Sequence, residues 1–311
     1  MQTKGKLLVL VGPTAVGKTN LSLHLAEKFN GEILSGDSMQ VYRGMDVGTA
    51  KASQKEQQQV RHHLLDLVNP DESFSVEEFQ KHAYEAIAAI HARSHLPMLV
   101  GGTGLYIQAV THGYRLPNIE EDVALRAKWN DFAEKEGNEA LWRKLQEQDE
   151  VTAMRLHPND RRRVIRALEV IANTGKPFSA QQVQQKPPYD ILFLGLTMPR
   201  ELLYKRINER VDHMIAAGLL QEVRALYAQG YGRELTSMQA LGYKEIMQHL
   251  AGEISLDEAI ERIKRGTRKF AKRQLSWFRR MDEIHWFDCT ASDFQQEITS
   301  LIAGDFLAHR E

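Results

Sequence analysis

The chain has 311 residues, of which 42% are hydrophobic, and its 40 Lys and Arg against 41 Asp and Glu give a formal net charge of -1. This composition excludes a mainly disordered chain, and the near-zero charge gives no global sign of a polyanionic partner. The one cysteine, Cys289, excludes an internal disulfide and a cysteine-based zinc site, and no apolar stretch approaches the length of a membrane span. We therefore expect a cytoplasmic protein that has no membrane partner and acts as a monomer.

Short apolar runs along the chain predict the strands of a parallel sheet. The first run is residues 7–11, directly before Gly12, and segments with helical periodicity separate most of the later runs. Continuous apolar runs that alternate with helices are typical of strands buried on both faces. The sequence therefore predicts an α/β fold with a parallel sheet flanked by helices. The further predicted strands are residues 32–35, 64–68, 97–101, 191–195 and 284–287.

The strand pattern is interrupted between Pro117 and Pro188, in a segment rich in Glu, Arg and Gln with helical periodicity. We therefore predict an all-helical insertion domain at residues 117–188, within a core domain formed by residues 1–116 and 189–311. The alternative is a set of unusually long crossover helices inside a single domain. Helices dominate again after residue 200, including a long basic helix at about residues 255–281.

A glycine-rich loop follows the first predicted strand and matches the pattern G-x-x-x-x-G-K-[ST] in full. Its glycines allow backbone N–H groups to surround phosphate oxygens, and the following helix adds the positive end of its dipole. The lysine supplies a charge and the last hydroxyl can bind Mg²⁺. The loop therefore predicts a P-loop NTPase-like core that binds a diphosphate or triphosphate, without indicating which bond is broken. Its residues are Gly12, Pro13, Thr14, Ala15, Val16, Gly17, Lys18 and Thr19.

Asp37 follows the second predicted strand, in the sequence Ser35-Gly36-Asp37-Ser38. The ligand crevice of an open α/β sheet lies beyond the carboxyl ends of its strands, so this carboxylate should face the bound phosphates. That position suits a general base acting on an amine or hydroxyl. It equally suits an Asx turn or a helix cap, and both interpretations stay open here.

The sequence lacks a clear second signature of a P-loop hydrolase, which is an Asp at the end of an apolar strand that helps to hold Mg²⁺. The predicted strand at residues 97–100 runs into Gly101-Gly102-Thr103 with no acid at its end. Asp66 is the alternative carboxylate, although it lies inside its apolar run. The Gly101-Gly102-Thr103 turn is either a close approach of backbone to a ligand or a tight strand-to-helix turn.

Four segments of the chain match one known family: the glycine-rich loop, residues 36–38, residues 41–51 and the Gly101-Gly102-Thr103 turn. Together they closely resemble the tRNA dimethylallyltransferases. The most specific part is residues 44–51, because no general nucleotide-binding rule requires that sequence. The resemblance implies transfer of a dimethylallyl group from its diphosphate to the exocyclic amine of the adenosine 3′ of the anticodon in tRNA, with release of pyrophosphate. Further matches, which extend it over nearly the whole chain, are residues 157–160, 166–169, 222–226 and 242–243.

The resemblance also implies roles for individual residues. Asp37 would be the base on the adenosine amine, Thr19 would position the diphosphate and the Mg²⁺ cofactor, and Arg224 would contact the diphosphate. Lys18 and the backbone N–H groups of the loop would meet the charge on the departing oxygens. Without further cysteines for a C-terminal zinc finger, the chain looks like the bacterial form. The implied contacts with the tRNA anticodon stem-loop are Asp37, Ser38, Met39, Gln40, Thr103, Arg126, Arg162, Arg163, Val164, Ile165, Arg166, Gln239, Gly242, Tyr243 and Lys244.

Two basic segments lie in an otherwise acidic chain, so the near-zero net charge is a cancellation. Residues 155–166 hold five arginines and residues 261–280 hold nine Lys or Arg, each with one acid. Such clusters are typical of contacts with an RNA backbone, and the alternative is a solvated helix face paired with acids. The resemblance favours RNA contact for Arg162, Arg163 and Arg166 and leaves residues 261–280 open.

Two other functions use the same motifs. A P-loop small-molecule or nucleoside kinase would place Lys18, Thr19 and Asp37 similarly and transfer phosphate to a hydroxyl. A nucleotide-switched RNA-binding protein would hydrolyse its nucleotide slowly. The missing strand-end Asp and an Arg-rich insertion larger than a small acceptor requires argue against both. For the transferase, the target base must leave its RNA loop, so we expect a channel that reaches the glycine-rich loop from the opposite side.

Overall fold

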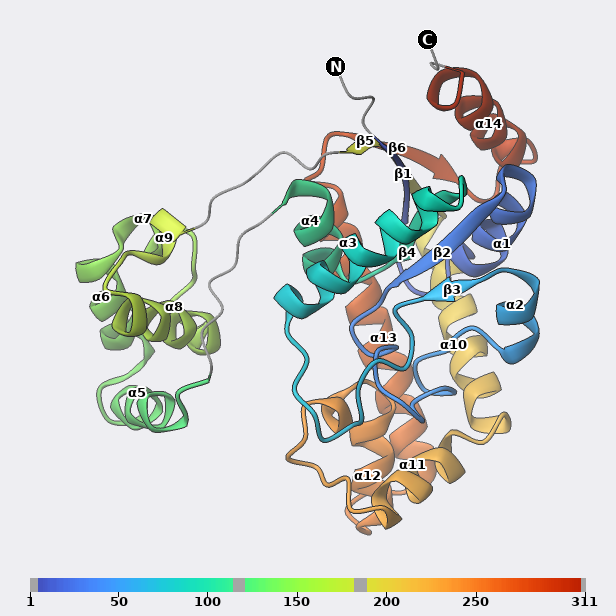
Figure 1. The fold of residues 1–311 in the computed structure, drawn as a ribbon. Helices are drawn as coiled ribbons and strands as arrows, with labels where there is room; N and C mark the ends of the chain where they lie inside the picture. Colours follow the sequence, from blue (N-terminus) through green and yellow to red (C-terminus); the bar gives the residue numbers. More distant parts are fainter. Residues whose placement is uncertain (1–4, 114–120, 182–188, 309–311) are drawn as a thin grey trace. The chain divides into compact units, whose positions relative to one another are not determined.

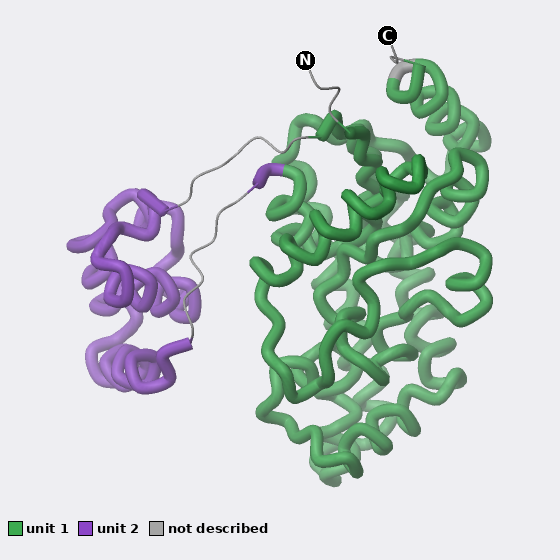
Figure 2. The backbone as a smooth tube through the Cα atoms, in the orientation of Figure 1, with its two compact units in different colours: residues 1–111, 188–311 green, residues 112–187 purple. Residues whose placement is uncertain are grey.

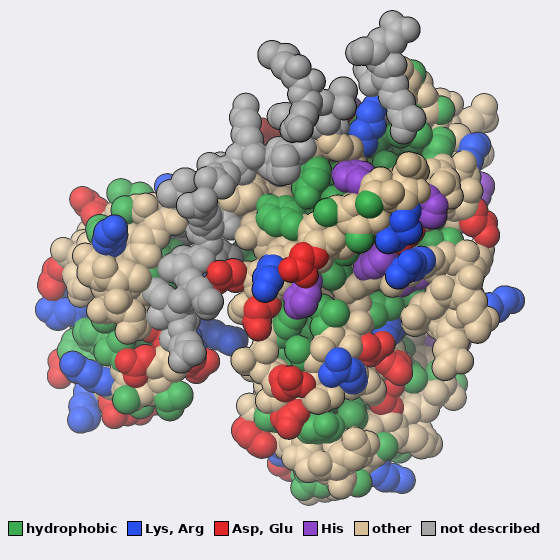
Figure 3. Space-filling model, in the orientation of Figure 1, with side chains coloured by type: hydrophobic (Ala, Val, Ile, Leu, Met, Phe, Trp, Pro, Cys, Tyr) green, Lys and Arg blue, Asp and Glu red, His purple; other side chains and the backbone are tan. Residues whose placement is uncertain are grey.

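The computed structural model describes residues 5–113, 121–181 and 189–308 and divides the chain into two compact units. Unit 1 comprises residues 1–111 and 188–311, and unit 2 comprises residues 112–187 (Figure 2). On the face of unit 1 drawn in Figure 3, Lys and Arg side chains lie among Asp and Glu side chains rather than in a patch of one sign. Within the described residues, no helix is long and apolar enough to cross a membrane.

Unit 1 is built on a six-stranded sheet with the strand order β3-β2-β4-β1-β5-β6 (Figure 1). Every neighbouring pair of strands is parallel. The predicted α/β fold with a parallel sheet flanked by helices is confirmed. The strands are β1 (Gly5–Val11), β2 (Gly31–Gly36), β3 (His62–His63), β4 (Leu96–Gly101), β5 (Tyr189–Thr197) and β6 (Ile284–Asp288).

The predicted strand at residues 64–68 is wrong. Strand β3 ends at His63, because Leu64 and Asp66 adopt the left-handed conformation with φ of 65° and 54°. A residue with an L side chain in this conformation turns the chain away from an extended ladder. The apolar run therefore forms a turn in which only Leu64 is buried, and the N–H of Asp66 donates to the carbonyl oxygen of Gln40.

Helices cover both faces of the sheet. Leu8 and Leu10 of β1 pack with one set of helices and Leu7 and Val9 with another, because successive strand residues point to opposite faces. The first set is α1 (Lys18–Phe29), α10 (Arg200–Ala216) and α14 (Phe294–Leu301). The second set is α3 (Val76–Ala92) and α4 (Gly104–His112).

A third apolar cluster joins the segment after β2 to the C-terminal helices. Val41, Met45, Val223 and Tyr243 are completely buried in it. Because this cluster is packed, it positions the chain that leaves the carboxyl end of β2. The helices that contribute to it are α10, α11 (Leu219–Ala228), α12 (Tyr243–Leu250) and α13 (Leu256–Phe278), with the short helix η1 (Ser237–Gln239). The other short elements of unit 1 are α2 (Gln54–Gln59) and η2 (Ile302–Phe306).

Unit 2 has an apolar core of its own, in which Leu141, Leu145, Val164 and Leu168 are almost completely buried. Each regular element in its described part, residues 121–181, is a helix. These helices are α5 (Val123–Glu136), α6 (Asn138–Gln148), α7 (Glu150–Ala153), α8 (Arg161–Thr174) and α9 (Phe178–Gln181). The basic segment at residues 155–166 contributes the first turns of α8.

Glu32, near the amino end of β2, is a buried carboxylate that stabilises one edge of the sheet. It accepts hydrogen bonds from Arg93 at 2.8 and 2.9 Å, from His63 at 2.6 Å and from His95 at 2.7 Å. Burial alone would raise the pKa of Glu32, but these hydrogen bonds outweigh it and lower the pKa to about 2. The ionised form therefore stabilises the fold above the ordinary pKa of 4.5, and this contribution is lost as the pH falls towards 2.

For Glu32→Gln we expect the free energy of unfolding at pH 7 to fall by about 2 kcal/mol, after allowing for solvent around Arg93. Denaturant unfolding between pH 7 and pH 3 would measure this loss. The loss should shrink as the pH falls from 4.5 towards 2, because the Glu32 carboxyl of the unfolded wild type takes up a proton in this range while that of the folded protein stays ionised. Glu85→Gln, at an exposed carboxylate on α3, is the control. A loss that stays the same over the whole pH range would contradict this account.

Candidate active site

The glycine-rich loop connects β1 to α1 and brings backbone and lysine together. A Cβ atom on Gly12 would lie 2.7 Å from the backbone oxygen of Leu196, so only glycine fits there. Gly17 has a φ of 111° and caps the start of α1. Lys18 folds back over the loop, and its Nζ donates to the carbonyl oxygens of Gly12 and Pro13, both at 2.9 Å. The loop, the start of α1 and this ammonium group together form a site suited to an anion.

The glycine-rich loop forms one wall of a cavity of about 370 Å³, which we call the loop cavity. Lys18, Thr19 and Asp37, the three predicted catalytic residues, all line it. The structure thus brings together residues from the ends of two different strands, as expected for a crevice at the carboxyl edge of a parallel sheet. Side chains that line it from α10 and α13 are Arg206, Arg210, Phe270 and Gln274.

Asp37 combines both interpretations that its sequence left open. Its Oδ1 accepts a hydrogen bond from the Met39 N–H at 2.8 Å, which is the geometry of an Asx turn. The same carboxylate lines the loop cavity. Burial raises the pKa of Asp37, and the Met39 hydrogen bond and the charges of Lys18 and Arg210 oppose this rise. The turn therefore holds the carboxylate in place, and burial makes it a better proton acceptor than an exposed aspartate.

Two partly buried cations, Lys18 and Arg210, line the loop cavity together with Asp37. Burial, together with the charge of Arg210, lowers the pKa of Lys18 to about 7, although Asp37 opposes this effect. Burial also lowers the pKa of Arg210, which is on α10. Two cations that repel each other in a partly desolvated site have a strong electrostatic affinity for a polyvalent anion. The electrostatics of the cavity therefore favour a diphosphate group.

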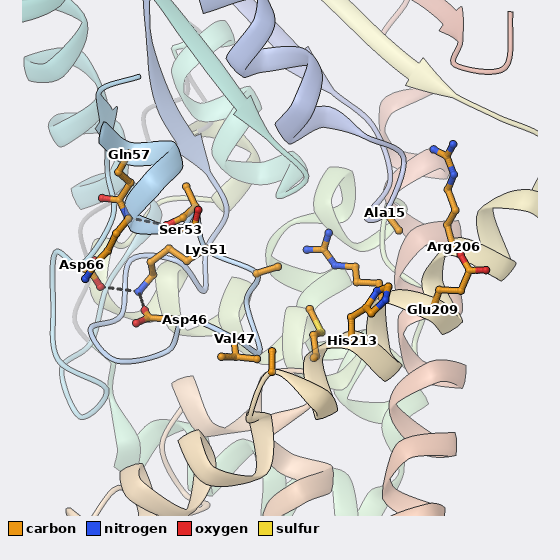
Figure 4. A pocket seen from close by; sticks show the side chains of 16 residues that line it. Ala15, Asp46, Val47, Lys51, Ser53, Gln57, Asp66, Arg206, Glu209 and His213 are labelled. Atoms are coloured by element: carbon orange, nitrogen blue, oxygen red, sulfur yellow. Dashed lines mark hydrogen bonds and ion pairs between the residues drawn. The ribbon is translucent and has the colours of Figure 1, made fainter. Parts of the chain in front are cut away.

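A larger cavity of about 770 Å³ adjoins the loop cavity (Figure 4). Its wall contains Asp46, Lys51 and Asp66, which form one ion-paired group: the Lys51 Nζ lies 2.5 Å from Asp46 and 2.6 Å from Asp66. Asp66 is thus neutralised by a lysine and does not line the loop cavity. The residues that line both cavities are Ala15, Ala50, Ala52, Arg206 and Arg210.

Gln274 connects two loops of the site, a role that sequence analysis missed. Its Oε1 accepts a hydrogen bond from the Thr14 N–H at 2.9 Å, and its Nε2 donates to the Gly102 oxygen at 3.0 Å. A Cβ atom on Gly102 would overlap the Gln274 amide, so this glycine allows a close approach of a side chain. Gln274 therefore ties the glycine-rich loop to the turn after β4. It lies on α13, whose basic residues gave no sign of this contact.

A family model described as IPP transferase matches residues 40–281. The chain belongs to this family. It is 50% identical to the tRNA dimethylallyltransferase of Bacillus pumilus, with 97% of each chain covered, and 52% identical to that of Geobacillus kaustophilus, with 96% of each covered. The predicted resemblance is confirmed.

Solved structures of IPP transferase relatives agree with this assignment. The full-length tRNA isopentenylpyrophosphate transferase of Bacillus halodurans has a TM-score of 0.73 and 48% identity, with 97% of each chain covered. A eukaryotic dimethylallyltransferase acting on tRNA has a TM-score of 0.82 and 33% identity, with 99% of this chain and 80% of that chain covered.

The structure does not bring Arg224, the predicted diphosphate contact, to either cavity of this IPP transferase family member. Helix α11 buries Val223 and Leu226 in the third apolar cluster, which leaves Arg224 exposed. Arg210 and Arg206, one turn apart on α10, line the loop cavity instead. A pair of arginines at this spacing is the signal that could have identified them.

The predicted tRNA contacts near Asp37 lie close together. The Ser38 N–H donates to the Thr103 Oγ1 at 3.0 Å. The Gln40 Oε1 accepts from the Ser35 hydroxyl at 2.7 Å, while its Nε2 donates to the Thr49 oxygen at 3.2 Å. Gln40 also lines the loop cavity. These bonds join the segment after β2 to the turn after β4, so the predicted contacts form one continuous edge of the site. Met39 is partly buried beside them.

The predicted contacts at residues 239–244 divide into two groups. Gln239 and Lys244 are exposed, and the Gln239 amide donates to the Arg233 carbonyl oxygen. Tyr243 is completely buried and Gly242 is buried beside it. The ring of Tyr243 packs in the third apolar cluster, and the contact of this residue with tRNA stays a prediction.

In unit 2, two of the predicted tRNA contacts, Val164 and Ile165, are side chains of the core. They face inward because α8 is amphipathic, and the contact of these two residues with tRNA stays a prediction.

Among the predicted arginines of unit 2, Arg126 and Arg166 form ion pairs with the buried Glu169 at 2.8 and 2.6 Å. Arg162 and Arg163 are exposed, and Arg163 lies 3.0 Å from Asp160. These last two are the better placed for an external partner.

The loop cavity fits a Mg²⁺ ion that arrives with a diphosphate. The Thr19 hydroxyl and the Asp37 carboxylate both line it, and Mg²⁺ often takes only one or two protein ligands together with water and phosphate oxygens. In the described part of the chain, no group of three or more His, Cys, Asp or Glu side chains could hold a metal ion by itself. Thr19 and Asp37 therefore supply oxygen donors of the kind that Mg²⁺ accepts beside a diphosphate.

Proposed function

We propose that this IPP transferase family member transfers a dimethylallyl group from dimethylallyl diphosphate to the exocyclic amine of the adenosine 3′ of the anticodon in tRNA. The observation that carries this proposal is that a partly buried carboxylate, Asp37, and two partly buried cations, Lys18 and Arg210, line one cavity at the glycine-rich loop. The names of its relatives supply the substrates, and the cavity supplies a base and a diphosphate site.

In the proposed reaction, the bond between the first carbon of the dimethylallyl group and its diphosphate oxygen breaks as a bond from the adenosine nitrogen to that carbon forms. Pyrophosphate leaves with the electron pair of the broken bond. Lys18, Arg210 and the N–H groups of the glycine-rich loop stabilise its growing negative charge. Thr19 would hold Mg²⁺, which when bound supplies further positive charge to the diphosphate.

The nitrogen that attacks must lose a proton, and Asp37 is placed to accept it. Burial raises the pKa of this carboxylate, so it holds the proton more strongly than an exposed aspartate would. The Met39 N–H holds one carboxylate oxygen in place. The proton thus moves from the adenosine amine to the Asp37 carboxylate.

The kinase alternative requires a different use of the same cavity. A kinase that follows the P-loop pattern would benefit from a strand-end Asp beside the Mg²⁺. Strand β4 ends at Gly101 without an acid, and Asp66 is paired with Lys51 in the adjoining cavity. These observations favour a loop that holds a leaving pyrophosphate. The cytoplasmic location and monomeric state expected from the sequence stay predictions.

The test is an incubation of the protein with Mg²⁺, labelled dimethylallyl diphosphate and unmodified tRNA with an A-rich anticodon loop. We expect label in the RNA. A parallel incubation with labelled ATP and nucleosides tests the alternative. Phosphate transfer to a small acceptor, with no label from dimethylallyl diphosphate in RNA, would overturn the proposal.

We propose that Arg162 and Arg163 on α8 contact the tRNA backbone. Replacing both with Ala should weaken tRNA binding and reduce the slope of log K against log salt by about 1 to 2, because each phosphate contact releases condensed counterions. Titrations of labelled tRNA at several salt concentrations measure that slope. Lys144→Ala together with Arg143→Ala, on exposed α6 side chains, is the charge-matched control. An unchanged slope would remove the two α8 arginines from the interface.

A further inference from the structure

The carboxylate of Glu222, on α11, is surrounded by four hydrogen-bond donors. Its Oε2 accepts from the backbone N–H groups of Asp46 at 3.0 Å and Val47 at 2.7 Å. Its Oε1 accepts from the Gly48 N–H at 3.1 Å and from the Tyr243 hydroxyl at 2.6 Å. Consecutive N–H groups that converge on one anion form a backbone nest. Here a side chain of the same protein fills the nest, and it holds residues 46–48 in one conformation.

Tyr243 supports this arrangement from α12. Its ring is completely buried, and a Cβ atom on residue 48 would overlap it, so only Gly48 allows this packing. Burial and the negative charge of Glu222 raise the pKa of Tyr243. Its hydroxyl therefore stays protonated and donates a hydrogen bond to the Glu222 carboxylate. Gly48, Tyr243 and Glu222 thus fit together closely at residues 46–48.

Residues 44–51, which we call the wall loop, line both cavities. Asp46, Val47 and Lys51 line the larger cavity (Figure 4), Thr49 lines the loop cavity, and Ala50 lines both. Glu222 lines neither of them. A change in the Glu222 contacts would therefore alter the cavities only through a shift of the wall loop.

We propose that Glu222 is a positioning residue for the prenyl donor. By holding the N–H groups of residues 46–48, it sets the wall of the cavities beside the glycine-rich loop and so the fit of dimethylallyl diphosphate. This inference rests on the proposed function. It assigns to the Glu222–Tyr243 pair an effect on donor binding and not on tRNA binding.

Glu222→Gln tests this inference with little change of shape. An amide has one acceptor oxygen where the carboxylate has two, and its NH₂ group faces donors. At least two of the four donors therefore lose their acceptor. We expect the KM for dimethylallyl diphosphate to rise about tenfold, from the loss of hydrogen bonds to a charged group, while kcat changes less and the Kd for tRNA stays the same.

Hydrogen exchange of the wall-loop amides gives a readout that does not depend on activity. In Glu222→Gln, the amides of residues 46–48 should exchange faster than in the wild type, because their acceptor is weakened. Tyr243→Phe keeps the ring and removes one donor, so it should give a smaller change of the same kind, and it serves if the glutamine variant does not fold. Glu85→Gln, at an exposed carboxylate, is the control and should leave both readouts unchanged.

The outcomes separate this inference from the proposed function. Unchanged exchange and an unchanged donor KM in Glu222→Gln and Tyr243→Phe would overturn the positioning role. A weaker tRNA affinity with an unchanged donor KM would also overturn it, since the wall loop would then serve the RNA. If the wild type transfers no dimethylallyl group at all, the proposed function fails, and the exchange measurement still decides whether Glu222 holds the loop.

Discussion

Asp37→Asn is expected to lower kcat for prenyl transfer by roughly 10²–10⁴-fold, the usual contribution of a general base. The asparagine Oδ1 can still accept the Met39 hydrogen bond, so the turn after β2 should persist. The amide cannot accept the proton of the adenosine amine, so the defect should appear in the chemical step. Binding of tRNA and of dimethylallyl diphosphate should be largely unchanged. Single-turnover transfer and equilibrium binding, measured on the same preparation, separate these effects.

The pH dependence of kcat gives a second check of the role of Asp37. The base must be ionised to accept a proton, so kcat of the wild type should fall as the pH drops through the pKa of Asp37. Since burial raises that pKa above the ordinary value of 3.8, the fall should occur at a higher pH than for an exposed aspartate. The residual rate of Asp37→Asn should lack this fall. Wild-type turnover in the asparagine variant would refute the role of Asp37 as the base.

Arg210→Ala is expected to lower kcat/KM for dimethylallyl diphosphate by roughly 10²–10³-fold, the typical cost of removing one group that stabilises developing charge. Arg210 lines the loop cavity beside Lys18 and is close enough to depress the pKa of that lysine. Its loss would leave the departing diphosphate with one side-chain cation fewer in the loop cavity. Steady-state kinetics with varied donor, and calorimetry with pyrophosphate as the ligand, would measure the effect.

Arg224→Ala is the matched control for Arg210→Ala. Both variants remove an arginine from a helix of unit 1, but Arg224 is exposed on α11 and lines neither cavity. The structure predicts near wild-type kinetics for Arg224→Ala, whereas the resemblance alone assigned the diphosphate contact to this residue. A large defect in Arg224→Ala, together with a small one in Arg210→Ala, would contradict the assignment.

The parts of the site that lie within one short segment could be predicted from the sequence. The glycine-rich loop follows a buried strand and starts a helix, so its pattern defines its own geometry. Asp37 follows the next strand in the same sheet, and a parallel sheet brings the ends of its strands to one edge. The alternation of apolar runs and helices predicted the sheet itself, although it did not detect the left-handed residues that end β3 at His63.

The parts of the site that depend on how helices rotate and pack could not be predicted in this way. Arg210 and Gln274 reach the loop cavity because the apolar faces of α10 and α13 are buried in a particular orientation. The resemblance implied that Tyr243 contacts tRNA, and in the structure its ring is buried and packs against Gly48. A resemblance therefore identifies positions that matter without stating whether they contact a substrate or support the residues that do.

The most direct test of the central claim is the stoichiometry of products from one reaction with tRNA and dimethylallyl diphosphate. Digestion of the RNA to nucleosides, followed by mass spectrometry, would count prenylated adenosines, and an enzymatic assay would count released pyrophosphate. The account predicts equal amounts of the two products, with every prenyl group on the adenosine 3′ of the anticodon. Release of pyrophosphate without prenylated RNA, or a prenyl group on a different nucleoside, would contradict it.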